Sequence, residues 1–540
     1  MSDKSLGKQK RCVSVCYAYQ LVINGRASPL IVSIGILDDD SLLNVFLLCR
    51  PFLLGEGGDN VERLYGGDEL WVQGRWWYKL AQVCQRWRNL LLGSAFYLRL
   101  SLVCTNGTPV KNMLEHSPPL PLTVDYRSKD RITAEDEKGI LLALEQRHRV
   151  RHLRLELPVP NLRKLVMAID EEFPILEYLI VEFWTKDSTA LKLPETLQAP
   201  HLRHLMLRGF TSITCPIRPR LHPTAPGLVT LSLIITHPSA YFQPNMLLQC
   251  LSFMPQLETL EIAFTFAVPN RDVERQLTHT PITTHITLPN LRFFWFRGVS
   301  AYLEAVVCRI TTPRLETLRI RLFEQLTLSV PRLVQFMNTA ENFRFDNATI
   351  MFQDKRIQVR MYLSEADTYA FVFRVDCWQL DWQASSVTQI CNALSQVFSA
   401  VEHITFRHEV HGQSSEEHND VDRIQWRKLL GSFSNVKTLV IEDGLVEQVS
   451  RCLRLEDGEL PLDLLPELQE LTYYGSSDAG DTFTPFIDAR QNAGHPVTPV
   501  FRCILRPGHP LESSSKTSES SSKASAITSA SGEAGNNTEI

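Results

Sequence analysis

Apolar residues recur along the chain in a short pattern, L-x-x-L-x-L, in which positions one, four and six are apolar. Seven clear copies begin at Val150, Leu176, Leu202, Leu228, Leu257, Leu291 and Leu315. The first four start 26 residues apart, at positions 150, 176, 202 and 228. Looser copies begin at Ala340, Ala370, Val401, Val436 and Leu468. This self-similarity predicts one supersecondary unit repeated along the chain.

Each copy predicts a short β-strand whose positions four and six face a core, while positions three, five and seven face the other way. One unit cannot bury its apolar face alone, but stacked units share a continuous core beside a parallel sheet. Motif and spacing together are typical of leucine-rich repeats. An ordinary α/β domain whose strands match by coincidence stays open as the alternative.

Two further features refine the prediction for the repeats. A proline stands two residues before most copies, which suits a strand entry because no ladder hydrogen bond is lost there. The regular Asn or Cys after the third leucine position is missing, so we expect an irregular or helical convex side.

Two amphipathic helices are predicted upstream of the repeats. One carries a stripe spaced i, i+3, i+4, i+7, formed by Leu80, Val83, Cys84 and Trp87. The other starts near Leu37, where acidic residues suit the positive end of the helix dipole and can cap free N–H groups, and Pro51 ends it. Its stripe consists of Leu42, Val45, Phe46 and Cys49. The glycine-rich segment between the helices, about 52–75, is predicted to be a loop.

The overall charge narrows the class of partner. A net charge of −5 and a pI near 6.3 argue against bulk affinity for nucleic acid or anionic membrane. The N-terminus has no signal-peptide layout and no apolar run near the ~18 residues of a membrane span, so we expect a cytoplasmic or nuclear protein. The twelve cysteines are scattered without a C-x-x-C pair, which favours reduced thiols.

Motifs for catalysis are missing from the sequence. It contains no G-x-S-x-G, no phosphate-binding G-x-x-x-x-G-K-[ST] and no H-E-x-x-H. His408, His411 and His418 gather near two glutamates, but they follow a strand in what reads as a polar loop, so we expect no metal there. We therefore expect a non-catalytic protein without a cofactor, while an enzyme of unrecognised type stays open.

The two predicted helices resemble the F-box. The first opens L-x-D-D-x-L-L-x-x-F, and the second contains V-C-x-x-W-R. The matching residues are Leu37, Asp39, Asp40, Leu42, Leu43, Phe46, Val83, Cys84, Trp87 and Arg88. The chain departs from the family pattern at Asp38, where the family has proline, and in its long inter-helix loop. The wider segment is similar to F-box-like proteins of mushroom-forming fungi, in which a long leucine-rich region follows.

The resemblance implies an α/β fold: a small helical F-box-like domain, then a curved leucine-rich-repeat solenoid with a parallel sheet on its concave face. It implies an SCF-type ubiquitin ligase subunit that docks to a Skp-type adaptor, and through it to cullin, while the repeats bind a target protein. The implied adaptor-binding residues are Leu37, Leu42, Leu43, Phe46, Val83, Trp87 and Leu91. Burial in an adaptor groove would be their role; packing of the two helices together is the alternative. For the whole chain, the alternative is a repeat scaffold with a degenerate F-box.

The predicted domain layout has five parts. Residues 1–36 are unassigned, 37–105 form the F-box-like domain, 106–145 form a linker and the entry to the repeats, 146–505 form the repeats, and 506–540 form a disordered serine-rich tail.

Arginines recur at the outward positions five and seven of the middle repeats. With two aromatic residues they form a predicted target-binding strip, namely Phe293, Trp295, Arg297, Arg319, Arg321, Arg344, Arg374 and Arg407. Because guanidinium groups grip carboxylate or phosphate in a fork geometry, an acidic or phosphorylated peptide is the expected guest. Asp346 and Asp376 lie at neighbouring positions, so a solvated face neutralised by local ion pairs is the alternative.

Overall fold

The computed structural model describes residues 37–49, 75–169, 171–183, 198–209, 225–238, 241–265, 285–323, 330–339, 343–353, 355–363, 369–376, 380–409, 420–442, 444–455, 459–475 and 481–503. The predictions for residues 1–36, for the inserted loop at 52–74, for the polar loop at 410–419 and for the tail at 506–540 lie outside these residues.

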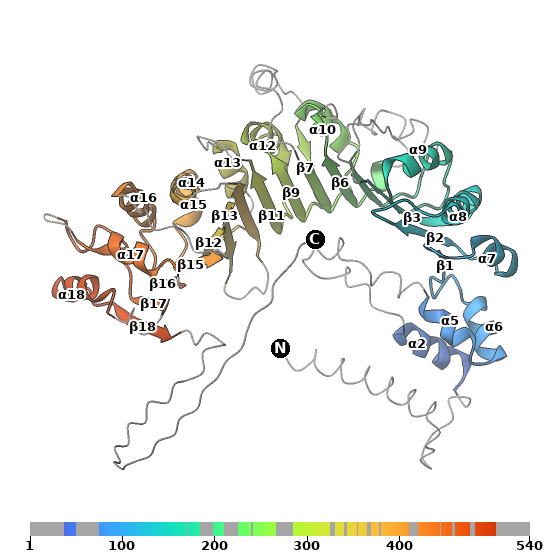
Figure 1. The fold of residues 1–540 in the computed structure, drawn as a ribbon, viewed down its shortest axis with the longest axis horizontal. Coiled ribbons are helices and arrows are strands. Elements are labelled where there is room, and N and C mark those ends of the chain that lie inside the picture. Colours follow the sequence, from blue (N-terminus) through green and yellow to red (C-terminus); the bar gives the residue numbers. More distant parts are fainter. Residues whose placement is uncertain are drawn as a thin grey trace, which may run out of the picture.

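A single 16-stranded sheet dominates the described part of the chain. In spatial order its strands are β1 (Leu102–Cys104), β2 (Leu122–Arg127), β3 (Val150–Glu156), β4 (Tyr178–Glu182), β5 (His204–Arg208), β6 (Thr230–Ile235), β7 (Thr259–Phe264), β9 (Phe293–Gly298), β11 (Thr317–Leu322), β14 (Phe371–Asp376), β13 (Arg356–Tyr362), β12 (Asn347–Gln353), β15 (His403–Glu409), β16 (Thr438–Ile441), β17 (Glu470–Gly475) and β18 (Thr498–Cys503). A short pair, β8 (Ile286–Thr287) and β10 (Ile310–Thr311), stands apart. The sheet curves into an arc (Figure 1).

Helices line the outer side of this arc (Figure 1). They are α7 (Val110–His116), α8 (Ala134–Glu145), α9 (Val159–Ala168), α10 (Pro244–Leu251), α12 (Ser300–Val307), α13 (Pro331–Thr339), α14 (Leu380–Ala393), α15 (Ser395–Phe398), α16 (Asp420–Leu430), α17 (Val446–Leu453) and α18 (Thr484–Asn492). Two 3-10 turns are described, at Arg147–Arg149 and Ala225–Gly227. The convex side is therefore helical over much of the described chain, and the predicted α/β class is confirmed.

The 26-residue repeat sets the alignment of strands β3 to β6. Leu153 pairs with Leu179, Leu179 with Leu205, and Leu205 with Leu231. These leucines are all buried and share one apolar cluster with helical residues such as Leu162. Position four of each repeat thus faces the helices, as the pattern predicts, and the core lies between sheet and helices.

The prolines before the repeats occupy a recurring β-turn. In the turn at Pro200, the Ala199 carbonyl accepts a hydrogen bond from the Leu202 N–H over 3.0 Å. The same bond spans the turns at Pro174, Pro255, Pro289, Pro313 and Pro466. Proline fits the second position of such a turn because its φ is already fixed near the required value. The turn buries the first leucine of each repeat beneath the strand entry.

The predicted strand order and register are wrong where the repeat pattern is loosest. The Ala340 and Ala370 copies were expected to form successive parallel strands, but β12, β13 and β14 form an antiparallel meander. These three strands follow β11 across the sheet in the reverse of their order in the chain, so β14 rather than β12 lies beside β11. Phe371, not Phe373, aligns with Leu318, which shifts this copy by two residues. Arg344 precedes β12 and belongs to no strand.

The sheet also begins earlier than the predicted start of the repeats at 146. Strand β1 at Leu102 and strand β2 at Leu122 pair in parallel, and β2 in turn pairs in parallel with β3. The segment 106–145, predicted as a linker and the entry to the repeats, contains β2 with helices α7 and α8. Asp125, a charged residue at a buried strand position, obscured β2 in the sequence pattern.

Candidate functional site

Within the described residues, three helices precede the sheet: α2 (Asp39–Cys49), α5 (Trp76–Ala81) and α6 (Gln85–Gly93). The centre of this helical unit, residues 37–49 and 75–100, is the contact of Phe46 with Trp87, whose rings meet edge to face at 5.0 Å. Leu42 and Leu91 are fully buried beside them. Four of the seven residues implied as adaptor anchors therefore form the core of the unit itself.

The other three implied anchors are accessible to different degrees. Leu37 and Leu43 are partly buried against the core, whereas Val83 is 47% exposed. The expectation that Val83 and Cys84 continue one helical stripe is wrong, because the helix ends at Ala81 and a new one begins at Gln85. Cys84 caps the second helix, its Sγ accepting from the Trp87 N–H over 3.5 Å.

The acidic start of α2 caps the helix as expected. The Asp38 carboxylate accepts from the Ser41 N–H over 2.7 Å, and this bond lowers the pKa of Asp38. An ion pair of 2.8 Å between Asp39 and Arg86 joins α2 to α6, and Arg86 also donates to the Leu37 carbonyl. Asp38, where the F-box pattern has proline, thus works as a helix cap.

The tryptophan-rich segment also fastens the helical unit to the sheet. The Trp77 indole donates to the Ser101 carbonyl over 3.2 Å, directly before β1. The Arg75 guanidinium reaches the Thr105 hydroxyl at 3.1 Å, directly after β1. Trp77 and Trp87 are therefore structural residues of the unit and its junction.

Exposed apolar side chains concentrate on the same unit. Eleven large apolar residues of the described chain are exposed, and four of them lie here: Leu48, Val83, Phe96 and Tyr97. Phe96 is the most exposed of the eleven, at 93%. Four exposed apolar side chains on so small a unit are candidates for contact with a partner.

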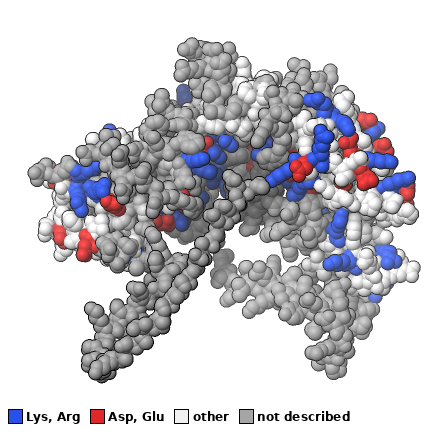
Figure 2. All heavy atoms as spheres, viewed as in Figure 1, with Lys and Arg blue, Asp and Glu red and all other residues white. Residues whose placement is uncertain are grey.

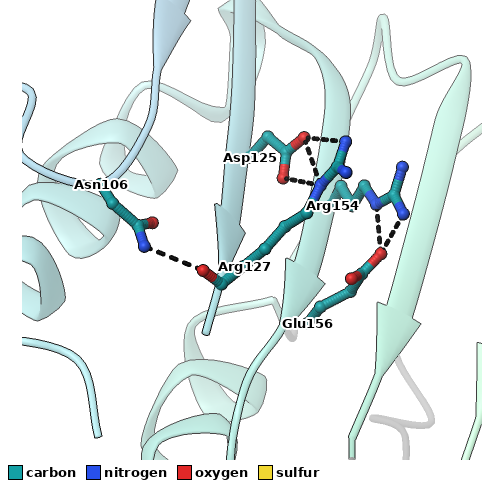
Figure 3. Close-up of polar contacts among 5 residues, drawn as sticks. All are labelled: Asn106, Asp125, Arg127, Arg154 and Glu156. Atoms are coloured by element: carbon teal, nitrogen blue, oxygen red, sulfur yellow. Dashed lines mark hydrogen bonds and ion pairs between the residues drawn. The ribbon is translucent and has the colours of Figure 1, made fainter. Parts of the chain in front are cut away.

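The inner face of the sheet, which is the concave face opposite the helices (Figure 1), carries paired charges on strands near its N-terminal end. Asp125 on β2 accepts from Arg127 at 3.1 Å, and Arg154 on β3 pairs with Glu156 (Figure 3). Glu182 on β4 pairs with Arg208 on β5 at 2.8 Å. Burial raises the pKa of Asp125 to about 7, with Arg127 acting in the opposite direction. These ion pairs compensate charge locally.

A ladder of rings crosses the same strands at position three and was missed in the sequence. The Tyr178 ring stacks on His204 at 4.1 Å and meets His152 edge to face at 4.6 Å. Burial lowers the pKa of both histidines to about 4, so they are neutral near pH 7. The 26-residue spacing of these three residues was the available signal.

The predicted arginine strip is brought together in part. Arg297, Arg321 and Arg374 pair in register on β9, β11 and β14 and form one row. Figure 2 shows Lys and Arg side chains over the middle strands, with acidic groups among them. Arg407 lies on β15, beyond β13 and β12, and Arg344 lies exposed before β12. The expectation that Arg344 continues the strip is therefore wrong.

Carboxylates and amides engage several members of the strip, as the alternative anticipated. Asp376 accepts from Arg321 Nε and Nη2, the shortest distance being 2.9 Å. Arg407 pairs with Glu442 at 2.7 Å. Arg374 Nε donates to the amide oxygen of Gln358 over 2.6 Å. Asp346, also expected to neutralise the strip, precedes β12 and accepts from the Asn347 amide.

Aromatic rings lie beside the same arginines. The Arg319 guanidinium lies 5.3 Å from the Phe293 ring centroid, and that of Arg297 lies 5.5 Å from Phe323. Trp295 is half-buried, two residues from Arg297 on the same face of β9. Phe323, just after β11, was not predicted, because its role depends on the strand pairing.

The described residues include no group of three or more His, Cys, Asp or Glu side chains that could hold a metal ion. Among these residues, no helix combines the length and apolar character needed to cross a bilayer. Comparison with protein-family models and with curated protein sequences finds no match to the chain.

Proposed function

We propose that this protein is a substrate-recognition subunit of an SCF-type ubiquitin ligase. In this proposal the helical unit is an F-box-like domain that docks to a Skp-type adaptor, and the curved sheet is a leucine-rich-repeat solenoid that holds the target. The protein would position the target near the ligase and perform no bond chemistry itself.

The observation that carries the proposal is the set of exposed apolar side chains on the helical unit. Leu48 and Val83 project from a unit whose own core is already filled by Leu42, Phe46 and Trp87. A helical surface that leaves apolar side chains in water gains free energy by inserting them into a partner's groove. The 26-residue register and the repeated proline turns support the solenoid assignment.

The proposal divides the implied anchors into two roles. Leu42, Phe46, Trp87 and Leu91 support the fold of the unit, whereas Leu37, Leu43 and Val83 contact the adaptor together with Leu48. Variants of the first group would unfold the unit, so loss of adaptor binding in them carries no information about contact. Variants of exposed residues test contact directly.

Capture of the full-length chain by the purified adaptor tests the proposal. We expect wild type to bind and the double variant Leu48→Asp/Val83→Asp to lose binding at least tenfold. Met246→Asp, an exposed apolar residue on α10, is the matched control and should bind as wild type does. A folded wild-type chain that fails to bind would refute the proposal and favour a repeat scaffold with a degenerate F-box.

A further inference from the structure

Arg297 stands out among the charged residues of the inner face. It lies on β9 between Ala263 of β7 and Arg321 of β11 in the sheet register. Its side chain is half-buried, and its Nε atom is buried without a hydrogen-bond acceptor. No ion pair reaches it from the described part of the chain; its one close partner is the Phe323 ring.

The electrostatic surroundings of Arg297 are those of an incomplete site. Burial lowers its pKa, and so do neighbouring positive charges, of which Arg321 is the strongest. Among the described residues, Asp376 acts on the pKa of Arg297 in the opposite direction, but Arg321 already engages its two oxygens. A partly desolvated cation without its own counter-ion costs free energy, which an incoming anion would recover.

The geometry of the row fits a compact, multiply charged anion. Neighbouring strands lie about 4.8 Å apart, so the stems of Arg297 and Arg321 leave the sheet side by side on one face. The ion pair with Asp376 orients Arg321, and the Phe323 ring covers one face of the Arg297 guanidinium. The donor edges of a guanidinium match the oxygens of a phosphate in a fork geometry.

The charge favours a phosphate over a single carboxylate. A phosphorylated side chain carries about −1.5 to −2 charges and three acceptor oxygens near pH 7, enough to serve two guanidinium groups at once. Trp295 and Phe293 continue along the same face of β9, so flanking residues of a bound peptide would pack on aromatic surface.

We infer that Arg297 and Arg321, with the aromatic surface of β9 beside them, bind a phosphorylated side chain of a peptide segment. The inference rests on the proposed function in one respect, because it takes the inner face of the sheet as the surface that holds the target. It adds the chemical class of that target: a segment recognised after phosphorylation.

Binding of the full-length chain to a randomised nine-residue peptide library with a central phosphoserine tests this inference. The comparison libraries carry serine or glutamate at the same position. We expect the phosphoserine library to bind at least tenfold better than either, and Arg297→Met to remove that preference. Arg292→Met is the matched control. Arg292 pairs with Glu316, and its backbone lies about 17 Å from that of Arg297 along the strand direction.

Three results would overturn the inference: equal binding of the phosphoserine and serine libraries, equal binding of the glutamate library, or full binding by Arg297→Met. A thermal melt excludes misfolding, since removing an uncompensated charge should leave the melting temperature of Arg297→Met unchanged or raised. The peptide assay contains no adaptor. Failure of adaptor capture with intact phosphopeptide binding therefore refutes only the ligase proposal, and the converse refutes only this inference.

Discussion

Replacing Trp87 with alanine removes a buried indole ring from the core of the helical unit. Trp87 is nearly fully buried and meets Phe46 edge to face, while its backbone N–H contacts the capping Cys84. The unit is small, so few other contacts can replace this one. We expect Trp87→Ala to open helices α2 and α6 together while the sheet stays folded.

The size of the effect follows from the burial. Truncating a buried Trp or Phe to alanine costs about 3–5 kcal/mol, including the cavity left behind. The edge-to-face contact accounts for about 0.5–1.5 kcal/mol of that. Val83→Ala, by contrast, removes two methyl groups from a half-exposed side chain and should cost under about 1 kcal/mol.

Hydrogen exchange followed by mass spectrometry measures these changes locally. In the full-length chain, amides of α2 and α6 should exchange at least a hundredfold faster in Trp87→Ala than in wild type, and those of β3 to β6 should not change. Val83→Ala should exchange like wild type throughout. Unchanged protection of α2 in Trp87→Ala would refute the assignment of Trp87 to the core.

Two further predictions concern buried charges in the sheet. Because burial raises the pKa of Asp125 from 3.8 to about 7, ionisation is penalised only in the folded state, so stability falls as pH rises between these values. Relative to Asp125→Asn, the wild-type unfolding free energy should drop by about 1.4 kcal/mol between pH 5 and 6 and less steeply toward pH 7, measured by urea unfolding; a difference independent of pH would contradict this. Arg490, fully buried in α18, donates to four backbone carbonyls within residues 461–468. Arg490→Met removes these four hydrogen bonds and should destabilise the C-terminal repeat by roughly 3 kcal/mol, seen as faster amide exchange in α18; wild-type protection there would count against this role.

The sequence was sufficient to predict the strands of the regular copies, because the burial of their leucines follows from each copy's own turn and strand. Position one closes a proline turn and position four faces the helices, so each repeat needs the same residues at the same spacing. Strand direction has no such local signal. Alternation of apolar residues has period two in parallel and antiparallel strands alike, so the pattern predicts two more parallel copies where the structure has the meander of β12 to β14.

The residues that meet at the candidate site could be predicted only where the order of the strands was predicted correctly. Arg321 and Asp376 lie 55 positions apart in the chain, and they meet because β14 folds back beside β11. Arg297 and Arg321 were correctly placed on one face, since both belong to regular repeats. In the helical unit, the i, i+3, i+4, i+7 spacing predicts one stripe for Val83 and Trp87, but the helix is interrupted between Ala81 and Gln85.

The most direct test of the central claim is the mass of the complex formed by the full-length chain and a purified Skp-type adaptor, measured by light scattering after size-exclusion chromatography. The proposed function predicts a 1:1 complex heavier than the 61.6 kDa chain by the mass of one adaptor, absent for Leu48→Asp/Val83→Asp. A folded wild-type chain that elutes alone at 61.6 kDa in the presence of excess adaptor would contradict it.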